Sequence, residues 1–511
     1  MQSEKKSSLF TIIGASSVGT MIEWYDFYIF GSLASIISTK FFPQGNPTAA
    51  FLSTLATFAA GFVVRPFGAL FFGRLGDLIG RKYTFMVTLL LMGGATFLIG
   101  CVPGYETIGF FAPLLILLLR LLQGLALGGE YGGAATYVAE HAPASKRGLM
   151  TSWIQTTATA GLFVSLLVIM ATRNLLTKEQ FNDWGWRVPF WVSILMVLVS
   201  YLIRKNMEES PVFARAKASG KTSANPLKES FGKKLNFKFV LLALFGAVMG
   251  QGVIWYTGQF YAMSFLEKTM NVDKEQVDSL MFIALMMGTP FFLFFGWLSD
   301  KIGRKWIMMV GMLIAILSYR PIYERMYQTV NLVGRQELVA KTATATQLLD
   351  HKDRTQTSIA TTTREYGDGT RLVQEKRTEM EDGRVKIVDG KEKVESRTTI
   401  FVNDTDKWRL IWLVFVQVLF VTMVYGPIAA FLVEMFPTRI RYTSMSLPYH
   451  IGNGVFGGLL PAVATYLTTS AQASGHGQWY LEGLWYPIGV GAVCLLIGML
   501  YINSKDKAIN D

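Results

Sequence analysis

The sequence predicts an all-helical membrane protein that crosses the bilayer many times and arose by duplication. Of its 511 residues, 51% are hydrophobic and 16% are charged, whereas soluble domains carry about 25% charged residues. Several apolar runs exceed the ~20 residues that a helix needs to cross the hydrocarbon. A polar loop that begins at Gly73 recurs at Gly296, again between two apolar runs. These three observations predict two related bundles of transmembrane helices.

The repeated loop suits a connection between antiparallel helices. Its copies read GRLGDLIGRK at 73–82 and GWLSDKIGRK at 296–305. Glycine permits a tight turn, the carboxylate suits a helix N-terminus or an arginine, and the basic residues favour the cytoplasmic side. We therefore expect Asp77 and Asp300 to hold N-terminal ends of helices in the opposite half.

A second motif recurs independently of the first. Glu140, Pro143 and Arg147 return as Glu434, Pro437 and Arg441, and a Thr-Ser pair follows each copy. The loop repeats with an offset of 223 residues and this motif with an offset of 294, a difference of 71 that a polar tract near 328–404 explains. We expect the two motifs to form an inner gate that consists of Asp77, Arg81, Glu140, Arg147, Asp300, Arg304, Glu434 and Arg441.

The loop resembles the signature of the major facilitator superfamily, and three further segments resemble its metabolite:proton symporter branch. These segments are EWYDF at 23–27, RLLQGLALGGE at 120–130 and PTRIRYT at 437–443. The branch includes carriers of shikimate, α-ketoglutarate, citrate, and proline or glycine betaine. The resemblance covers the chain except for the polar tract. It implies twelve transmembrane helices in two six-helix bundles, the major facilitator fold.

The apolar runs place the helices in order. The first six are expected at 9–38, 48–72, 83–102, 110–139, 149–172 and 188–204, so residues 1–204 form the first bundle. A cytoplasmic central loop, 205–238, leads to the second bundle. Its helices are expected at 239–266, 277–298 and 306–322, within 239–327, and at 408–436, 443–469 and 484–503, within 405–511. Basic residues concentrate beside the repeated motifs, so both termini are expected in the cytoplasm of a cell (inner) membrane.

The polar tract 328–404 falls on the outer side in this topology. Asp368-Gly369, Asp382-Gly383 and Asp389-Gly390 are turn dipeptides. Residues 384–388 and 399–402 have the composition of short strands. The pattern predicts a small β-rich insertion between helices nine and ten; a flexible linker is the alternative.

Few ionisable residues interrupt the apolar runs, and each is a functional candidate because charge in lipid is costly. Glu23 and Asp26 share a face of the first helix, and Arg120 and Gln123 share a face of the fourth. Arg120 needs an anion, for which Asp26 is the first candidate and Glu23 the second. We expect Asp26, with Glu23, to carry a coupling proton and Arg120 to bind a substrate carboxylate; a static ion pair is the alternative.

A substrate lining is also expected. Gln251, Trp255 and Gln259 recur at i, i+4 and i+8, and interhelical hydrogen bonds are the alternative reading of this stripe. We expect Glu130 to serve helix packing and Arg65 to serve the inner gate. The residues expected to bind substrate are Arg120, Gln123, Gln251, Trp255, Tyr256, Gln259, Tyr425 and His450.

These features predict a secondary active transporter that moves a small organic acid with a proton. A proline- or betaine-type osmolyte carrier and a non-transporting receptor that uses the insertion are the alternatives. The four histidines are scattered and no hydrolase or metalloprotease motif is present, so we expect no enzyme activity, catalytic residue, cofactor or metal. The net charge of +12 fits positive-inside loops rather than nucleic acid. The expected partners are the proton, a carboxylate or zwitterion, and the lipid bilayer, with the protein as a monomer.

Overall fold

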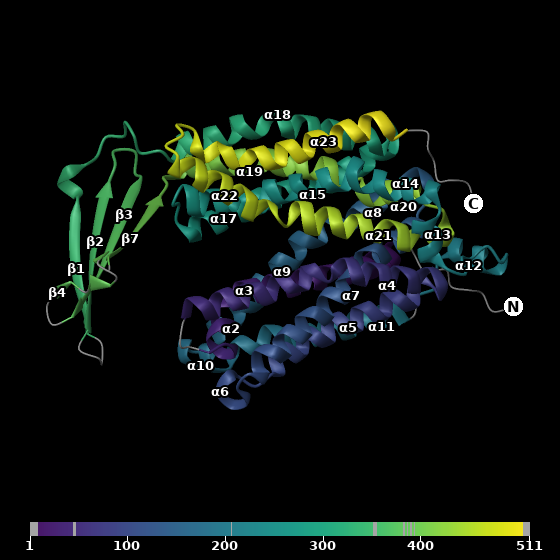
Figure 1. The fold of residues 1–511 in the computed structure, drawn as a ribbon, viewed down its shortest axis with the longest axis horizontal. Helices are drawn as coiled ribbons and strands as arrows, with labels where there is room; N and C mark the ends of the chain where they lie inside the picture. The colour runs from purple at the N-terminus through teal and green to yellow at the C-terminus, as the bar shows by residue number, and fades with distance from the viewer. Residues whose placement is uncertain are drawn as a thin grey trace.

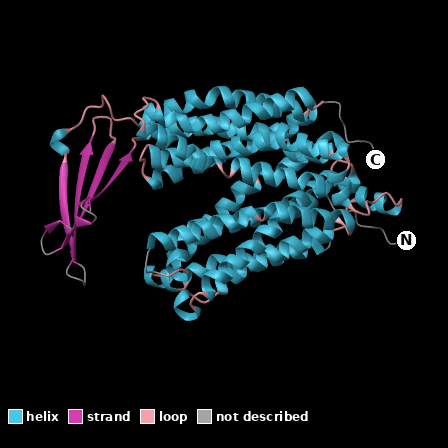
Figure 2. Cartoon of the chain, viewed as in Figure 1, coloured by secondary structure: helices cyan, strands magenta, loops and turns pink. Residues whose placement is uncertain are grey.

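Two helical halves lie side by side, and a β-sheet stands at one end of the molecule (Figure 1). The computed structural model describes residues 9–43, 47–205, 207–350, 355–381, 384–385, 387–388, 391–392 and 394–503. Helix predominates in both halves, and the sheet belongs to a single segment of the second (Figure 2). The structure is that of a mostly helical membrane protein.

The first half contains long helices, several of which break into two stacked pieces. The expected helix 9–38 breaks at Leu33, and the expected helix 48–72 breaks at Val64. The elements are α1 (Leu9–Ser32), α2 (Ala34–Phe41), α3 (Pro47–Val63), α4 (Arg65–Leu78), α5 (Arg81–Cys101), α6 (Tyr105–Ile108), α7 (Phe111–His141), α8 (Arg147–Gln155), α9 (Thr157–Leu175), α10 (Lys178–Asp183) and α11 (Val188–Lys205).

The second half repeats this plan with more irregular helices. Its first long helix and a later one contain π-helical segments, which often occur at functional sites. The elements are α14 (Lys234–Ala243), η3 (Leu244–Val248), α15 (Met249–Tyr256), η4 (Thr257–Tyr261), α16 (Ala262–Ser264), η5 (Phe265–Thr269), α17 (Lys274–Ile302), α18 (Arg304–Val330), α19 (Asp404–Tyr425), α20 (Ile428–Met435), α21 (Arg441–Ile451), η8 (Gly452–Gly457), α22 (Leu460–Ala473) and α23 (Trp485–Tyr501).

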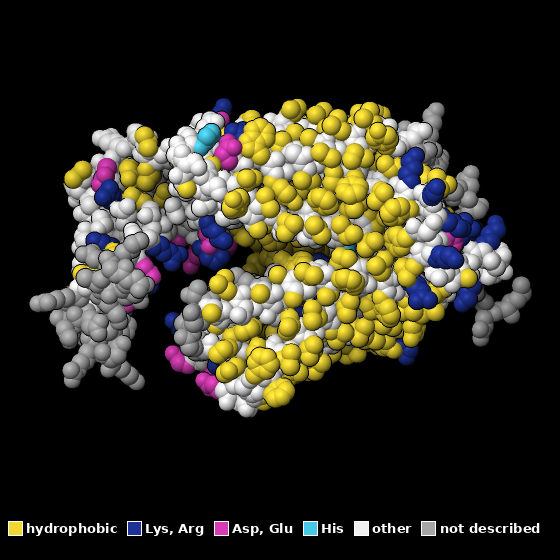
Figure 3. Space-filling view, in the orientation of Figure 1, with side chains coloured by type: hydrophobic (Ala, Val, Ile, Leu, Met, Phe, Trp, Pro, Cys, Tyr) yellow, Lys and Arg dark blue, Asp and Glu magenta, His cyan; other side chains and the backbone are white. Residues whose placement is uncertain are grey.

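Within the described part of the chain, 10 helical segments are long and apolar enough to cross a membrane. Hydrophobic side chains cover the flanks of both halves, and a group of Lys and Arg side chains lies at the end opposite the β-sheet (Figure 3). We call this end the repeat-loop end, because loops 73–82 and 296–305 lie there, and the opposite end the sheet end. The apolar flanks match the lipid-facing surface of a multi-pass membrane protein.

The halves touch at the repeat-loop end and separate toward the sheet end. Figure 3 shows the cleft that opens between them. At the closed end, α21 of the second half packs on α4 of the first, and α17 of the second half packs on α8 of the first. A site between the halves is therefore reached from the sheet end.

The central loop contains helices that the sequence analysis did not predict. They are α12 (Pro211–Ala218) and α13 (Pro226–Gly232), each with proline in its first turn and a capping side chain, Ser210 and Asn225. Helix α14 begins at Lys234, so the predicted loop end at 238 was late. These short helices lie against the repeat-loop end (Figure 1).

The insertion forms a five-stranded antiparallel sheet and a separate two-stranded ladder. In the sheet, β1 pairs with β2, β2 with β3, and β3 with both β4 and β7. The strands are β1 (Ala343–Asp350), β2 (Thr355–Glu365), β3 (Arg371–Glu381), β4 (Arg384–Val385), β5 (Ile387–Val388), β6 (Lys391–Glu392) and β7 (Val394–Phe401). The turn dipeptides Asp382-Gly383 and Asp389-Gly390 lie outside the described residues.

The insertion begins later than the sequence indicated. Helix α18 continues through Pro321 to Val330, whereas the ninth helix was predicted to end at Ile322. The sheet is fixed to the second half by the backbone of Ile400, which donates to Asn271 at 2.7 Å and accepts from Asp273 at 2.9 Å. Arg335 binds Asp368 of the β2–β3 turn and Asp406 of α19. The sheet is therefore held at the ends of three helices.

Candidate functional site

The ionisable candidates gather where the cleft narrows. One cavity is lined by Glu23 and Asp26 of α1, Arg65 of α4, and Arg120 and Gln123 of α7. A neighbouring cavity shares Glu23 and Arg65 and adds residues of the second half. Its added polar and aromatic lining includes Trp255, Tyr256, Tyr425, Tyr449, His450 and Asn453. The first cavity lies within the first half and the second between the halves, and we treat them as one site because they share Glu23 and Arg65.

A chain of hydrogen bonds connects Asp26 to Arg120. Thr96 of α5 donates to Asp26 at 2.5 Å, Gln123 donates to Thr96 at 2.5 Å, and Arg120 donates to the Gln123 carbonyl oxygen at 2.8 Å. The guanidinium of Arg120 also lies over the Phe30 ring, 4.0 Å from its centroid. All four polar residues are buried. The sequence analysis identified three of them, and only the fold supplies Thr96.

Arg65 belongs to this site rather than to the inner gate, so that prediction was wrong. Its guanidinium lies 3.9 Å from the Glu23 carboxylate and 4.2 Å from the centroid of the Phe62 ring. The break between α3 and α4 starts a new helix at Arg65, which directs this side chain to the cavities. The site therefore contains two arginines and two carboxylates.

Aromatic side chains join the halves around the cavities. Trp24 of α1 lies 5.2 Å from Trp255 of α15, and Phe27 lies 6.1 Å from Phe260, between ring centroids. Helix α21, which carries the buried His450, packs on α7. Contacts between α1, α7, α15 and α21 thus cross the interface at the level of the site.

A stacked tyrosine pair also crosses the interface. The rings of Tyr131 and Tyr449 lie 3.7 Å apart with an interplanar angle of 5°. The Tyr449 hydroxyl lies 2.7 Å from that of Tyr425, and Gln155 donates to the Tyr131 hydroxyl at 2.8 Å. This buried layer lies beside the second cavity, so it separates the site from the helices of the repeat-loop end.

The polar stripe of the seventh predicted helix divides between two roles. Trp255 and Tyr256 line the second cavity. Gln251 instead exchanges hydrogen bonds of 3.1 and 3.2 Å with Asn453 of η8, as the interhelical reading predicts. Gln259 is buried in η4 and is not among the residues that line the two cavities. Gln259 lies in the π-helical segment η4, where the regular i, i+4 spacing of the predicted stripe does not apply.

Glu130 makes a buried ion pair that fits its expected packing role. Its carboxylate lies 2.8 Å from the guanidinium of Arg204 and accepts a 2.8 Å hydrogen bond from Thr88. The guanidinium of Arg204 also stacks on Phe85, 3.4 Å from the ring centroid. Arg204 was expected only as the end of the sixth helix. The pair joins α7 to α11 and α5.

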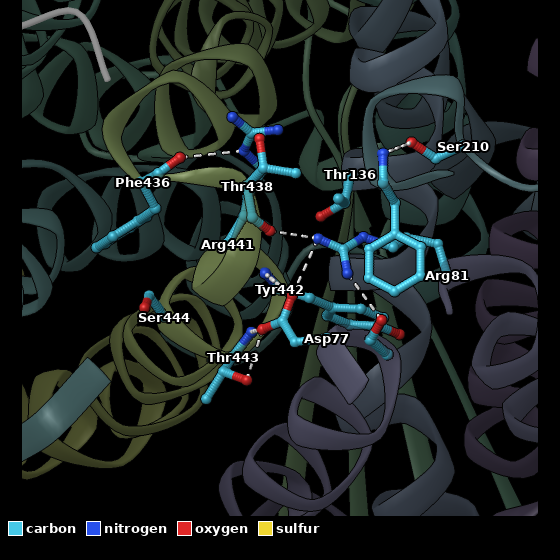
Figure 4. Close-up of polar contacts among 12 residues, drawn as sticks. Asp77, Arg81, Thr136, Ser210, Phe436, Thr438, Arg441, Tyr442, Thr443 and Ser444 are labelled. Carbon is cyan, nitrogen blue, oxygen red and sulfur yellow. Dashed lines mark hydrogen bonds and ion pairs between the residues drawn. The ribbon is translucent and has the colours of Figure 1, made fainter. Parts of the chain in front are cut away.

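The first loop binds the N-terminus of α21 (Figure 4). Asp77 accepts hydrogen bonds from the backbone N–H of Tyr442 at 3.3 Å and of Thr443 at 2.8 Å, and from the Thr443 hydroxyl at 2.7 Å. Arg81 lies 3.0 Å from Asp77 and donates to the Thr438 carbonyl at 2.6 Å. A Cβ on Gly73 would lie 2.9 Å from the Cα of Thr443, so glycine allows the close approach.

The second loop makes the corresponding contacts with α8. Asp300 accepts from the backbone N–H of Gly148 at 2.8 Å and of Leu149 at 2.9 Å. Arg304 pairs with Asp300 at 2.8 Å and with Glu434 at 3.0 Å. Each loop therefore places a carboxylate at the N-terminus of a helix in the opposite half, where the helix dipole favours a negative charge.

The second repeated motif adds ion pairs across the same face. Glu140 pairs with Arg441 at 2.8 Å and with Arg81 at 3.6 Å, and Glu434 pairs with Arg147 at 3.1 Å. The gate residues predicted from the sequence thus form two related clusters at the repeat-loop end. Both clusters connect the halves.

The central loop supports these clusters, which the sequence analysis did not anticipate. Glu209 accepts from the backbone N–H of Arg81 at 3.1 Å, and Ser210 donates to Glu140. On the other side, Glu229 pairs with Arg439 at 2.7 Å. Burial acts to raise the pKa of Glu229, but hydrogen bonds and the nearby cations hold that pKa below its ordinary value. The loop therefore braces both halves.

Comparison with known proteins agrees with this architecture. Residues 11–240 match a family described as sugar (and other) transporter. The chain is 39% identical to the inner membrane metabolite transport protein YhjE of Escherichia coli over 324 residues, covering 61% of this chain and 72% of the relative. It is 35% identical to the proline/betaine transporter of Salmonella typhimurium (58% and 61% covered) and 34% identical to the alpha-ketoglutarate permease of Escherichia coli (62% and 72% covered).

The fold is also that of a solved transporter. The proton:xylose symporter XylE, bound to 6-bromo-6-deoxy-D-glucose, aligns with a TM-score of 0.69 at 15% identity, covering 98% of this chain and 97% of that one. Its identity is low, so this likeness concerns the fold alone. The YhjE match, the apolar helices and the duplicated loops support one assignment. The chain belongs to the family of metabolite transporters that includes YhjE, and it has the fold of the major facilitator superfamily.

Proposed function

We propose that the protein carries a small organic acid together with a proton by alternating access. The observation that carries this proposal is the buried chain Asp26–Thr96–Gln123–Arg120, which borders a cavity in the first half. That cavity shares Glu23 and Arg65 with a second cavity, which residues of both halves line. A carboxylate that binds a proton and a guanidinium that binds a carboxylate are thereby linked in one site. The cleft gives this site access to one side of the membrane.

The proposed topology has twelve crossings. The pairs α1–α2 and α21–α22 would add to the 10 segments that meet the length and hydropathy criteria. The repeat-loop end is cytoplasmic, because Lys and Arg gather there (Figure 3). Both termini are then cytoplasmic, and the sheet within 328–404 lies outside. Residues 1–204 and the segments 239–327 and 405–511 form the two bundles.

The charge balance of the site couples proton binding at Asp26 to substrate binding at Arg120. With Asp26 ionised, the positive charge of Arg120 is offset through the hydrogen-bond chain and the empty site is nearly neutral. A proton that reaches Asp26 removes this compensation, so Arg120 then attracts a substrate carboxylate. Burial makes either charge costly without its partner. Proton and anion therefore enter together, and neither is favoured alone.

The clusters at the repeat-loop end act as the inner gate in this proposal. The carboxylates of Asp77 and Asp300 hold α21 and α8, and the stacked pair Tyr131–Tyr449 lies between them and the site. Rocking of one half against the other breaks these contacts and opens the site to the cytoplasm. The closed gate and the open cleft correspond to an outward-facing state.

Reconstitution in liposomes tests the proposal. Uptake of labelled small carboxylates is measured with an imposed pH gradient, acidic outside, and without it. The wild type should accumulate a carboxylate only with the gradient, and Asp26→Asn should lose this accumulation. Arg120→Gln should lose uptake under both conditions. Full gradient-driven uptake by Asp26→Asn would exclude Asp26 as the coupling residue.

A ligand panel tests the substrate class. Thermal-shift measurements with mono-, di- and tricarboxylates and with betaines should show stabilisation by carboxylates, and Arg120→Gln should abolish it. The relative named alpha-ketoglutarate permease supports a dicarboxylate as the first compound to test. Stabilisation by quaternary ammonium compounds alone would replace the organic acid with an osmolyte.

A further inference from the structure

Thr96 occupies the middle of the chain between Asp26 and Arg120. It lies on α5, its side chain is buried, and its hydroxyl has three partners. These are the Asp26 carboxylate at 2.5 Å, the Met92 carbonyl at 3.0 Å and the Gln123 amide N–H at 2.5 Å. The first two partners accept hydrogen bonds, but a hydroxyl carries a single hydrogen. Thr96 therefore serves Asp26 or Met92, and never both fully.

Gln123 gives the chain a direction. Its amide N–H groups face Thr96, and its carbonyl oxygen accepts from Arg120 at 2.8 Å. The hydroxyl oxygen of Thr96 is therefore used as an acceptor, and its hydrogen points onward to Asp26 or back to Met92. A carboxylate accepts hydrogen bonds more strongly than a neutral carbonyl. An ionised Asp26 thus draws the hydrogen of Thr96 toward itself.

A protonated Asp26 reverses this preference. Its own O–H donates to the second lone pair of Thr96, and the hydroxyl of Thr96 turns to the Met92 carbonyl. Thr96, Gln123 and one oxygen of Asp26 stay hydrogen-bonded in both arrangements, as burial favours. The Gln123 N–H remains on Thr96 throughout. The only changes are the proton on Asp26 and the rotation of one hydroxyl.

We propose that Thr96 is a positioning residue whose hydroxyl rotates between Asp26 and Met92 and so sets the pH range of proton coupling. The proposal rests on the proposed role of Asp26 as the proton carrier. Donation by Thr96 favours the ionised form of Asp26, which allows the proton to leave after transport. Without this donor, Asp26 holds its proton at higher pH and releases it more slowly.

Other charged groups also face Asp26, so the test must isolate Thr96. Glu23 lies on the same helix, Arg65 on α4 and Arg120 on α7, and all line the first cavity. Replacing Thr96 with valine keeps the shape and leaves these charges in place. Serine at the same position keeps the hydroxyl and removes only a methyl group. The two variants therefore separate the hydrogen bond from the packing.

The test is the pH profile of gradient-driven carboxylate uptake in liposomes. In Thr96→Val, the external pH that gives half-maximal uptake should rise by about one unit, the effect of one hydrogen bond to a carboxylate. The maximal rate should fall because the proton leaves more slowly. Thr96→Ser should restore the wild-type profile. Thr54→Val provides the matched control, since the buried Thr54 hydroxyl donates to the Ala50 carbonyl of its own helix.

The outcomes separate this inference from the proposed function. If Asp26→Asn loses gradient-driven uptake but Thr96→Val keeps the wild-type profile, the role of Thr96 is wrong and the function stands. If Asp26→Asn retains that uptake, the proposed coupling fails. A shifted profile in Thr96→Ser would also contradict the hydroxyl mechanism. If Thr96→Val cannot be reconstituted, Thr96→Ala removes the same hydroxyl and should show the same shift.

Discussion

Replacing Asp77 with asparagine tests whether the first loop holds the repeat-loop end closed. The carboxylate is buried and binds the first turn of α21 through the backbone of Tyr442 and Thr443 and through the Thr443 hydroxyl. These contacts join the two halves, so they are present only while the halves meet. Asparagine keeps the size of the side chain but removes its charge and one acceptor.

The magnitude follows from the contacts that are lost. A negative charge at a partly buried helix N-terminus is worth about 1–2 kcal/mol, and a backbone N–H left without its acceptor costs about 1–3 kcal/mol. Water replaces part of these contacts when the halves separate. We therefore add the lower ends of the two ranges, which gives about 2 kcal/mol. Since 1.4 kcal/mol is tenfold, the open fraction should rise about thirty-fold.

Cysteine labelling measures this fraction. Ser446 of α21 is buried at the closed interface, against Gly132 of α7. A Ser446→Cys reporter in a Cys101→Ser background should react with a maleimide only when the repeat-loop end opens. Asp77→Asn should raise the labelling rate about thirty-fold.

Two matched variants serve as a positive and a negative control. Asp300→Asn removes the equivalent carboxylate from the N-terminus of α8 and should raise labelling in the same direction. Asp183→Asn, at the exposed end of α10, changes the same side chain away from the gate and should leave labelling unchanged. An unchanged rate in Asp77→Asn, with the protein folded, would refute the reasoning.

Three further substitutions test separate parts of the molecule. Glu130→Ala leaves the buried Arg204 without this carboxylate and should destabilise the protein by about 3–5 kcal/mol, measured as a lower Tm; a loss below about 1 kcal/mol would contradict a structural pair. Arg335→Met should speed hydrogen exchange in the β2–β3 turn. Acidification should lower the protection of these amides relative to their intrinsic exchange rate at each pH. Hydrogen bonds and Arg335 outweigh burial and lower the pKa of Asp368, so its contribution persists at neutral pH and is lost as pH falls through the lowered pKa. Equal protection in wild type and variant would contradict this. Tyr449→Ala should weaken closure by about 1 kcal/mol and speed Ser446→Cys labelling about fivefold, whereas the phenylalanine variant keeps the stack and should label slowly.

Duplication made the contacts at the repeat-loop end predictable from the sequence. Asp77 and Asp300 occupy matching places in two loops, and Glu140 and Glu434 do so in two later motifs. A repeated pattern fixes relative position, because each copy meets the other half in the same way. The contacts of Asp77 with Thr443 and of Asp300 with Gly148 follow this symmetry. Run length and composition similarly identified the 10 described segments that are long and apolar enough to cross a membrane.

The central site was only partly predictable. Asp26 and Arg120 stood out because charges are rare in apolar helices, but the sequence could not show what lies between them. Thr96 comes from a third helix and resembles many other membrane threonines. Arg65 was misassigned because its direction depends on a helix break. Gln259 stays a prediction, because it lies in a π-helical segment whose spacing the sequence pattern did not anticipate.

The amino-acid sequence by itself determined the membrane location, the duplication and the residues able to carry charge, because hydrophobicity and repeats are properties of the chain. The tertiary structure decided which of those charges meet. The rotation and height of each helix depend on packing against neighbours, and that packing brings Thr96, Gln123 and Arg65 to the site. A hydrogen bond requires atoms within about 3 Å, a tolerance far finer than any sequence pattern sets.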